Sequence, residues 1–357
     1  MIHFECDYTE GAHPSVIEKL CSTNLEQTNG YGNDPYCERA RSVIRQLAEM
    51  PDADVHFLVG GTQTNRTVIS SILRPHQGVI AASTGHIAVH ETGAIEASGH
   101  KVLTIASTDG KITASGIKDL VMAHYSDNDH EHCVQPGMVY ISFPTETGTL
   151  YSKRELQELS SLCCELGLPL YIDGARLGYG LMADGNDLTL PEMARLCDVF
   201  TIGGTKGGAL FGEAVVFTNS TLSKDFRYLI KQNGGMLAKG RLLGVQFLAL
   251  LESGIYFDIA RHADRLAMKI KNALSDMGIK FHCPCTTNQQ FVYLPIGLIQ
   301  RLSDKYSFSI APCDKEGYRT VRICTSWATK EETVNELISD ITAYYPSSQS
   351  NHHETID

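Results

Sequence analysis

The chain has 357 residues, of which 43% are hydrophobic and 20% charged, and its 41 acidic and 30 basic side chains give a net charge of −11. At roughly 150 residues per domain this length suffices for about two domains, and the composition excludes a disulfide-stapled miniprotein and an intrinsically disordered chain. The acidic balance leaves no basic stripe for the phosphates of a nucleic acid, so we expect no nucleic-acid partner.

Between residues 55 and 217, short apolar runs alternate with amphipathic segments. Such alternation is typical of an α/β fold, in which a mostly parallel sheet is covered on both faces by helices. The predicted strands are residues 55–59, 79–81, 102–106, 138–143, 170–172, 200–202 and 215–217. Residues 153–166 exemplify the predicted helices, because their leucines recur three or four positions apart and form one apolar face.

The pattern changes after about residue 234. We predict helices at 242–251, 256–277 and 330–345 and strands at 291–294 and 320–324. Gly278 is expected to end the second helix, and Thr329 with Glu332 has the spacing of a capping box at the start of the third. We therefore divide the chain into a large domain with an N-terminal arm (1–250), a smaller α+β domain (251–346) and a disordered tail (347–357).

Membrane and export signals are not expected. The most apolar segment, residues 242–251, is about half as long as the ~20 residues that cross a bilayer. Acidic side chains occupy the first residues, where a signal or transit peptide carries basic ones. The 11 cysteines are scattered without a C-x-x-C pair, which favours reduced thiols over a zinc or disulfide framework. We expect a cytoplasmic protein with no membrane partner.

Ligands of open parallel sheets bind at the carboxyl ends of the strands, so the residues after each strand are the first candidates for a site. Gly60, Gly61 and Thr62 follow the first strand and precede a helix. Glycines permit close backbone approach, and the free N–H groups of a helix start attract a phosphate. The segment lacks G-x-G-x-x-G and Walker A spacing, so a plain strand-to-helix turn is the alternative.

Charged side chains follow two further predicted strands. Asp173 lies at the end of the strand at 170–172, where a buried carboxylate needs a positive partner. That partner is either Arg176, in an internal ion pair, or the protonated nitrogen of a bound heterocycle. Lys206 follows the strand at 200–202 between glycines. It is either an exposed loop lysine or, at a crowded strand end, an amine that loses its proton readily and acts as a nucleophile.

His86 follows the strand at 79–81. Together with His90 and Glu91 it offers metal ligands about one helical turn apart, but the segment lacks the H-E-x-x-H pattern of zinc enzymes. We therefore predict no metal site and keep His86 among the candidate site residues.

Taken together, the glycine turn, the histidine, the aspartate and the lysine occur after successive strands in an order more specific than any one of them. In this order the chain resembles the pyridoxal-phosphate enzymes of the aspartate-aminotransferase fold (fold type I), and within them the low-specificity threonine aldolase branch of the β-eliminating lyase family. The likeness extends to about residue 345 and is carried by residues 6–7, 31–35, 61–65, 173–176, 205–207 and 321–322.

The resemblance implies pyridoxal 5′-phosphate as cofactor and assigns residues to it. Lys206, preceded by Thr205, would hold the cofactor's aldehyde as a Schiff base. Asp173 would keep the pyridine nitrogen protonated, which makes the ring an electron sink. Gly61 and Thr62 would bind the phosphate.

The resemblance also assigns residues around the ring and the substrate. His86 would stack on the ring face, and Arg176 would lie near the ring's phenolic oxygen and the substrate carboxylate. Arg322 would be the main carboxylate-binding arginine, for which its planar fork is suited. In this family Tyr31 and Lys231 reach the cofactor of the neighbouring subunit, which implies a homodimer or homotetramer with active sites at the subunit interface.

The implied reaction is the cleavage of threonine, allo-threonine or a related β-hydroxy-α-amino acid to glycine and an aldehyde. A base must remove the β-hydroxyl proton, and Glu146 is our candidate, with a helix-capping or loop-bracing acid as the alternative. With Lys206 and His86, Glu146 completes the predicted catalytic residues of a carbon–carbon lyase.

Three positions depart from the family's pattern. Glu146 lies where some members have a histidine proposed to act near the β-hydroxyl. Cys6 stands where many members have a serine near the substrate carboxylate, and a thiol is the weaker donor. Leu237 stands where the family often has an arginine that reaches a phosphate across the dimer, and we assign neither Lys239 nor Arg241 in its place.

Other functions stay open at this point. The same cofactor also supports β-elimination, racemisation and transamination. A dinucleotide-dependent oxidoreductase would suit the sheet but requires the G-x-G-x-x-G that is absent after the first strand. A non-catalytic protein of this fold would have no physical need for Lys206, Asp173, His86 and Arg322 together.

Overall fold

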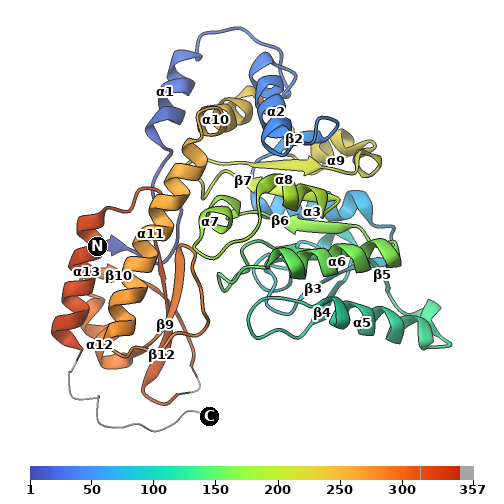
Figure 1. Cartoon of the computed structure of the whole chain (residues 1–357). Helices are drawn as coiled ribbons and strands as arrows, with labels where there is room; N and C mark the ends of the chain where they lie inside the picture. Colours follow the sequence, from blue (N-terminus) through green and yellow to red (C-terminus); the bar gives the residue numbers. More distant parts are fainter. Residues whose placement is uncertain (314, 346–357) are drawn as a thin grey trace.

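A seven-stranded sheet forms the centre of the computed structural model, which describes residues 1–313 and 315–345 (Figure 1). The strand order is β2-β8-β7-β6-β5-β3-β4. The strands are β2 (Asp54–Leu58), β3 (Gln77–Ala82), β4 (Val102–Ile105), β5 (Gln135–Ser142), β6 (Leu170–Asp173), β7 (Val199–Gly203) and β8 (Glu213–Phe217). Neighbours from β4 to β7 pair in parallel, whereas β8 runs antiparallel to β2 and β7. The predicted mostly parallel sheet is confirmed.

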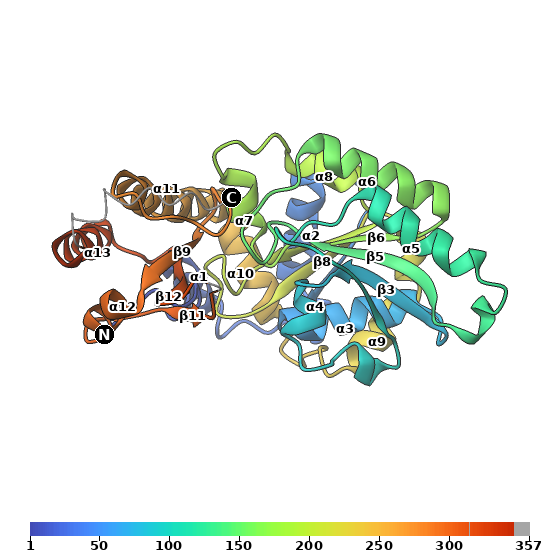
Figure 2. The ribbon, with the colours of Figure 1, turned by 90° about the horizontal axis from the view of Figure 1, so that it is seen from below.

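Helices cover both faces of this sheet, and Figure 2 shows α5, α6 and α8 on one side and α3, α4 and α9 on the other. Strand residues alternate between the two hydrophobic cores: Ile80 and Ile141 lie in one, and Val79 and Tyr140 in the other. Burial on both faces explains why each strand is an apolar run. The first face carries α2 (Pro35–Leu47), α5 (Ala114–Ser126), α6 (Lys153–Leu166), α8 (Leu190–Arg195) and α10 (Arg241–Leu251), and the second α3 (Gly61–Ile72), α4 (His86–Val89) and α9 (Phe226–Gln232).

The C-terminal part has its own core around a three-stranded antiparallel sheet of order β11-β12-β9. Its elements are α11 (Ile255–Asp276), β9 (Gln289–Pro295), α12 (Ile296–Leu302), β10 (Tyr306–Ser307), β11 (Ser309–Ala311), β12 (Tyr318–Cys324) and α13 (Glu331–Tyr344). The predicted α+β character is confirmed. The chain start also joins this core: β1 (Ile2–His3) pairs with β10, and Phe4 packs in the same cluster. This pairing brings residues 5–7 beside β12.

Several boundaries test the local predictions. Gly278 has φ +75 and follows α11, so the predicted helix end is confirmed. The predicted capping box is wrong, because Lys330 is the N-cap of α13 without a side-chain bond, and the Thr329 hydroxyl accepts from the Ser326 N–H instead. The predicted tail at 347–357 lies outside the described residues. The remaining elements are α1 (Pro14–Ser22), η1 (Glu96–Ser98), η2 (His130–His132), α7 (Leu177–Met182) and η3 (Ser220–Ser223).

Within residues 1–313 and 315–345, no single helix is both long and apolar enough to cross a membrane. The consecutive helices α10 and α11 pass the same test only as a pair that bends by 66° at the break. Helix α10 is packed in the first core, where Leu243, Phe247 and Leu250 are buried.

Candidate functional site

Several of the predicted site residues lie at the carboxyl edge of the central sheet. Asp173 ends β6 and lies beside Ser142 of β5 in the ladder. Lys206 follows β7 by three positions. Since β8 is antiparallel, its first residue, Glu213, lies at this same edge, opposite Gly203. Side chains far apart in the sequence are thereby brought to one place, as expected for an open parallel sheet.

Two glycines allow the loops after β6 and β7 to touch. A Cβ at Gly174 would collide with the carbonyl of Thr201, and one at Gly203 would collide with the carbonyl of Ala175. The contact is held by hydrogen bonds from the Gly174 N–H to the Thr201 hydroxyl (2.8 Å) and from the Gly203 N–H to the Gly174 carbonyl (2.9 Å). The glycines therefore set how closely the acid after β6 approaches the lysine after β7.

Lys206 is not the exposed loop lysine of the alternative interpretation, because it is half-buried at this edge. Burial lowers the pKa of its amino group, and the positive charge of Arg176 lowers the same pKa further. A lowered pKa raises the share of the neutral amine, which is the nucleophilic form. The Tyr179 hydroxyl donates to the Lys206 carbonyl (2.6 Å), and the Thr205 hydroxyl accepts from the Gly212 N–H (3.1 Å). These two bonds hold the backbone around the lysine.

Asp173 is buried and is surrounded by neutral donors. Its Oδ2 accepts from Asn65 Nδ2 (2.9 Å) and the Tyr140 hydroxyl (2.7 Å), and its Oδ1 accepts from the Ala175 N–H (2.9 Å). The alternative of an internal ion pair with Arg176 is wrong. Asp173 has no ion-pair partner in the part of the chain that the structure describes, and burying such a carboxyl group is costly. The arrangement therefore fits a ligand that brings a positive charge, such as a protonated ring nitrogen.

Arg176 pairs with Asp7 instead. Its Nε and Nη2 donate to the two carboxylate oxygens at 2.7 and 3.0 Å, and Asn288 Nδ2 adds a third bond at 2.9 Å. Asp7 is completely buried. Burial alone would raise the pKa of Asp7, but the charges of Arg176 and Lys206 lower it below its usual value. Arg176 is therefore neutralised before any substrate binds.

Arg322 has free donor capacity, in contrast to Arg176. Its Nη2 donates to the Glu5 carbonyl (2.6 Å) and its Nη1 contacts the Gln289 amide oxygen (3.5 Å). Its buried Nε has no hydrogen-bond partner among the described residues. Cys6 comes next in the chain after Glu5 and is half-buried. The side chains at this point could receive an anionic ligand group.

The start of α3 is open to a ligand. No side chain caps it, and a Cβ added to Gly60 or Gly61 would meet nothing within 4 Å. The first N–H groups of the helix, including that of the exposed Thr62, are thus unobstructed. Such a helix start fits a phosphate. The half-buried Lys206, the buried Asp173 without an ion-pair partner among the described residues and this helix start together fit pyridoxal phosphate.

Glu146 contacts the first residue of α4. Its Oε1 accepts from the His86 N–H (2.8 Å) and from the Ser142 hydroxyl (2.6 Å). Burial raises the pKa of Glu146, although the Ser142 hydroxyl opposes this effect. Glu146 therefore caps a helix, as the alternative interpretation proposes, and also has the raised pKa of a candidate base.

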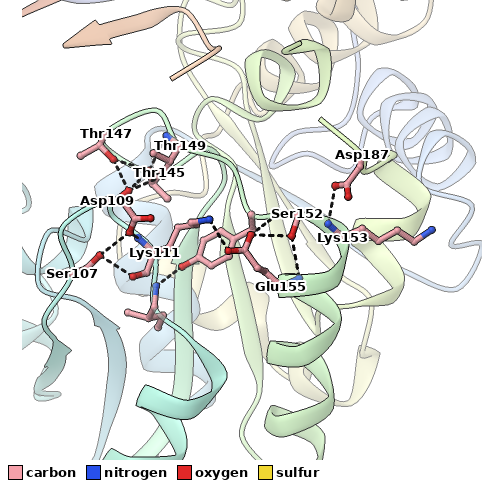
Figure 3. Close-up of polar contacts among 12 residues, drawn as sticks. Ser107, Asp109, Lys111, Thr145, Thr147, Thr149, Ser152, Lys153, Glu155 and Asp187 are labelled. Atoms are coloured by element: carbon pink, nitrogen blue, oxygen red, sulfur yellow. Dashed lines mark hydrogen bonds and ion pairs between the residues drawn. The ribbon is translucent and has the colours of Figure 1, made fainter. Parts of the chain in front are cut away.

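The loop that carries Glu146 is braced by threonines (Figure 3). The hydroxyls of Thr147 and Thr149 each donate to the Asp109 carbonyl at 2.6 Å, and the Thr145 and Thr149 hydroxyls share a bond of 2.7 Å. The position of Glu146 thus does not depend on its own hydrogen bonds alone.

Tyr31 and Lys231 lie side by side on the surface of the same chain. The Lys231 Nζ is 5.0 Å from the centre of the Tyr31 ring, and that tyrosine is 46% exposed. Arg227 donates to the Tyr31 carbonyl (3.1 Å), close to Met236. Arg241, considered above as a substitute at Leu237, donates to the carbonyls of residues 24 and 26.

The structure adds residues that the sequence prediction did not assign. Their side chains contact the predicted residues or lie at the same edge; they are Asp7, Asn65, Glu91, Tyr140 and Glu213. Asp7 and Asn65 lie within the segments that carry the family resemblance, and Glu91 was considered only as a metal ligand. Glu213 had a weaker signal, an acid directly before an apolar strand.

Comparison with known proteins gives a consistent result. The model of the family described as "beta-eliminating lyase" matches residues 4–296. A low-specificity L-threonine aldolase of a Pseudomonas species is 32% identical over 347 residues, which cover 95% of this chain and 97% of that protein. The corresponding protein of Pseudomonas aeruginosa is 31% identical over 345 residues, covering 95% and 96%.

Solved structures agree. The threonine aldolase of Leishmania major superimposes with a TM-score of 0.93 at 42% identity, covering 96% of this chain and 99% of that one. An aspartate aminotransferase mutant of Thermus thermophilus gives a TM-score of 0.71 at 15% identity, covering 96% and 91%. This second likeness concerns the fold alone, and it confirms the predicted aspartate-aminotransferase fold.

Proposed function

This chain belongs to the β-eliminating lyase family, and from that membership we propose that it is a pyridoxal-phosphate-dependent carbon–carbon lyase that cleaves threonine or a related β-hydroxy-α-amino acid to glycine and an aldehyde. One observation carries the proposal: Asp173 is buried among neutral donors, at the same sheet edge as an amine whose pKa is lowered by burial. These two groups are the partners that the ring nitrogen and the aldehyde of the cofactor need.

The proposal assigns the cofactor to residues of this edge. Lys206, with Thr205 bracing its loop, binds the aldehyde, Asp173 faces the ring nitrogen, and the start of α3 at Gly61 and Thr62 holds the phosphate. When bound, pyridoxal phosphate supplies a protonated ring that takes up the electron pair of a broken bond to the substrate's Cα.

Substrate orientation falls mainly to Arg322. Its unpaired Nε leaves part of its fork free for a carboxylate, whereas Arg176 already neutralises Asp7 and contributes a second, weaker anchor. Cys6 lies next to this point in the chain as a weak donor. Two anchors fix the rotation of the amino acid and thereby select which bond at Cα breaks.

Two groups at the edge can accept the proton of the β-hydroxyl: the Glu146 carboxylate and the ring of His86. Neither is needed for racemisation or transamination. Those reactions and β-elimination remain the alternatives, because the cofactor-binding residues are common to all of them.

We include assembly and location in the proposal. Tyr31 and Lys231 are exposed side by side and so are available to a neighbouring subunit, which supports a homodimer or homotetramer with shared sites. Mixing a Lys206→Ala subunit with a Lys231→Ala subunit should then restore part of the lost activity, because one hybrid site has both lysines. Failure to restore any activity in a verified hybrid would contradict shared sites. We also propose a cytoplasmic location.

The deciding experiment identifies the lysine and the reaction together. The purified protein, loaded with pyridoxal phosphate, is reduced with borohydride and mapped by mass spectrometry, and we expect the adduct on Lys206. The protein is then incubated with threonine, with β-chloroalanine, and with an amino acid plus a keto-acid acceptor. Aldehyde and glycine from threonine alone would support aldol cleavage. An adduct elsewhere, or turnover of β-chloroalanine or the keto acid without aldehyde from threonine, would overturn it.

A further inference from the structure

Glu91 is a buried acid that the reaction proposed above does not use. Its side chain is 0% exposed, and its Oε1 accepts from Asn65 Nδ2 (2.7 Å) and contacts His86 Nδ1 (2.7 Å). Its Oε2 has no hydrogen-bond partner among the described residues. Such a group is costly to bury and so calls for a function.

The neighbouring amide determines where the protons lie. Asn65 Nδ2 also donates to Asp173 Oδ2 (2.9 Å), and Asn65 Oδ1 accepts from the Tyr171 hydroxyl (2.6 Å). If the Asn65 amide were flipped, its carbonyl oxygen would face the acceptor oxygens of Glu91 and Asp173. The hydrogen bonds therefore fix the orientation of this amide. A carboxylate oxygen can only accept a hydrogen bond, so in the 2.7 Å contact between Glu91 Oε1 and His86 the hydrogen comes from Nδ1.

We propose that Glu91 is a positioning residue that holds His86 as the Nδ1–H tautomer, which leaves Nε2 unprotonated as the acceptor of the substrate's β-hydroxyl proton. In that transfer the proton leaves the hydroxyl oxygen for Nε2, the oxygen keeps the electron pair, and Glu91 stabilises the imidazolium that forms. A carboxylate that orients an imidazole in this way is a recurrent arrangement in acid–base catalysis. This inference rests on the proposed function and deepens it by choosing His86 over Glu146.

The surroundings of His86 support this choice. Its ring is 34% exposed, and its Nε2 makes no hydrogen bond among the described residues. Its backbone N–H is held by Glu146 Oε1, which also takes the Ser142 hydroxyl and so has less capacity left for a substrate. The Asn65 amide joins Glu91 to Asp173, so the residue facing the ring nitrogen and the one holding His86 are parts of one rigid network.

The first test reads the tautomer directly and needs neither cofactor nor activity. The cofactor-free protein is labelled with ¹⁵N-histidine, and the signal of His86 is identified by its absence in His86→Gln. We expect a protonated Nδ1 and an unprotonated Nε2 in the wild type, and loss of this preference in Glu91→Ala. A wild-type His86 with the proton on Nε2, or an unchanged tautomer in a folded Glu91→Ala protein, would overturn the proposal.

The second test concerns the loaded enzyme. Glu91→Ala should lower kcat by about 10²-fold or more, the contribution typical of a positioned base, while the KM for threonine changes much less. Glu91→Gln keeps the shape of the side chain and so guards against misfolding. Its kcat should lie between those of the wild type and Glu91→Ala, because the glutamine oxygen accepts a hydrogen bond but carries no charge. The matched control is Glu96→Ala, an exposed acid of the next turn, which should behave as wild type. An unchanged kcat in both Glu91 variants would sink the assignment. If the wild type itself released no aldehyde from threonine, the proposed function would fail while the tautomer result still stood.

Discussion

Removing the carboxylate of Asp7 tests the charge arrangement of the site most directly. Asp7 is fully buried, and Arg176 donates two hydrogen bonds to it. In Asp7→Ala the guanidinium would stay buried without a partner. We therefore expect the variant to fold less stably and to bind pyridoxal phosphate more weakly, because an uncompensated positive charge then lies near Lys206.

The size of the expected stability loss follows from the burial of the ion pair between Asp7 and Arg176. Breaking a buried ion pair by removing one partner costs about 3–5 kcal/mol, whereas an exposed pair contributes at most ~1 kcal/mol. The matched control is the pair of Arg261 and Asp258, whose side chains are 60% and 72% exposed. Urea unfolding of the cofactor-free proteins, at one fixed protein concentration, should show a large loss of unfolding free energy for Asp7→Ala and a small one for Asp258→Ala. The double variant with Arg176→Ala should lose less than the sum of its single variants, because neither charge is then left alone.

The same prediction has a defined pH dependence. The folded-state pKa of Asp7 is lowered, so the folded protein binds fewer protons than the unfolded one between that pKa and the unfolded value of about 3.9. The stability from this group is therefore complete above about pH 4 and is lost as the pH falls through the folded pKa. The difference in unfolding free energy between wild type and Asp7→Ala should therefore shrink as the pH falls through this range. If Asp7→Ala lost no more unfolding free energy at pH 7 than Asp258→Ala, the reasoning would be refuted.

Three further substitutions test other parts of the site and its surroundings. Arg322→Lys should raise the KM for threonine about tenfold or more with little change in cofactor affinity, because a lysine lacks the bidentate fork; an unchanged KM would remove Arg322 from substrate binding. Burial raises the pKa of Asp264, although the backbone of Asn288 opposes this effect. The folded protein therefore binds more protons than the unfolded one above about pH 4, and its unfolding free energy falls there by up to ~1.4 kcal/mol per pH unit. Asp264→Asn should lack this loss. If urea unfolding from pH 5 to 8 gave the same dependence of unfolding free energy on pH for the wild type and Asp264→Asn, the prediction would be contradicted. Burial also raises the pKa of Glu213, which favours its uncharged form, although the charge of Lys206 opposes this effect. Glu213→Gln should therefore bind pyridoxal phosphate nearly as tightly as wild type in an absorbance titration, and a large loss of affinity would mean that Glu213 is ionised and paired with Lys206.

The sheet could be predicted because its strands are buried on both faces and therefore appear as apolar runs. The predicted strand at 200–202, for example, lies within β7. The direction of β8 could not be predicted, because it depends on which strands become neighbours. Strands of two or three residues, such as β1 and β11, are too short to show a period. The capping box at Thr329 failed because a shift of one residue at a helix start changes which side chain is the cap.

The candidate site residues could be predicted mainly because they lie at the end of a strand or directly after one. Lys206 and His86 follow strands of the central sheet and Asp173 is the last residue of one, and so they could be predicted as site candidates. The place of Asp7 depends on the pairing of β1 with β10, a contact between the two ends of the chain that no local pattern shows. Glu91 was noticed as a possible metal ligand, but its contacts with His86 and Asn65 required the fold.

One ambiguity could be resolved only by the fold, and its outcome has a physical consequence. Two acids, Asp7 and Asp173, compete for one arginine, and the structure gives the arginine to Asp7 and three neutral donors to Asp173. The cost of burying Asp173 is then recovered only when a ligand places a positive charge beside it. Asp173 forms no ion pair with a side chain of the described residues, so a ring nitrogen that gained a proton beside it would supply the missing partner charge. The same arrangement leaves Arg322 with a buried Nε that has no hydrogen-bond partner among the described residues. In the proposed function, cofactor chemistry and substrate orientation would therefore depend on different charges and could be altered separately.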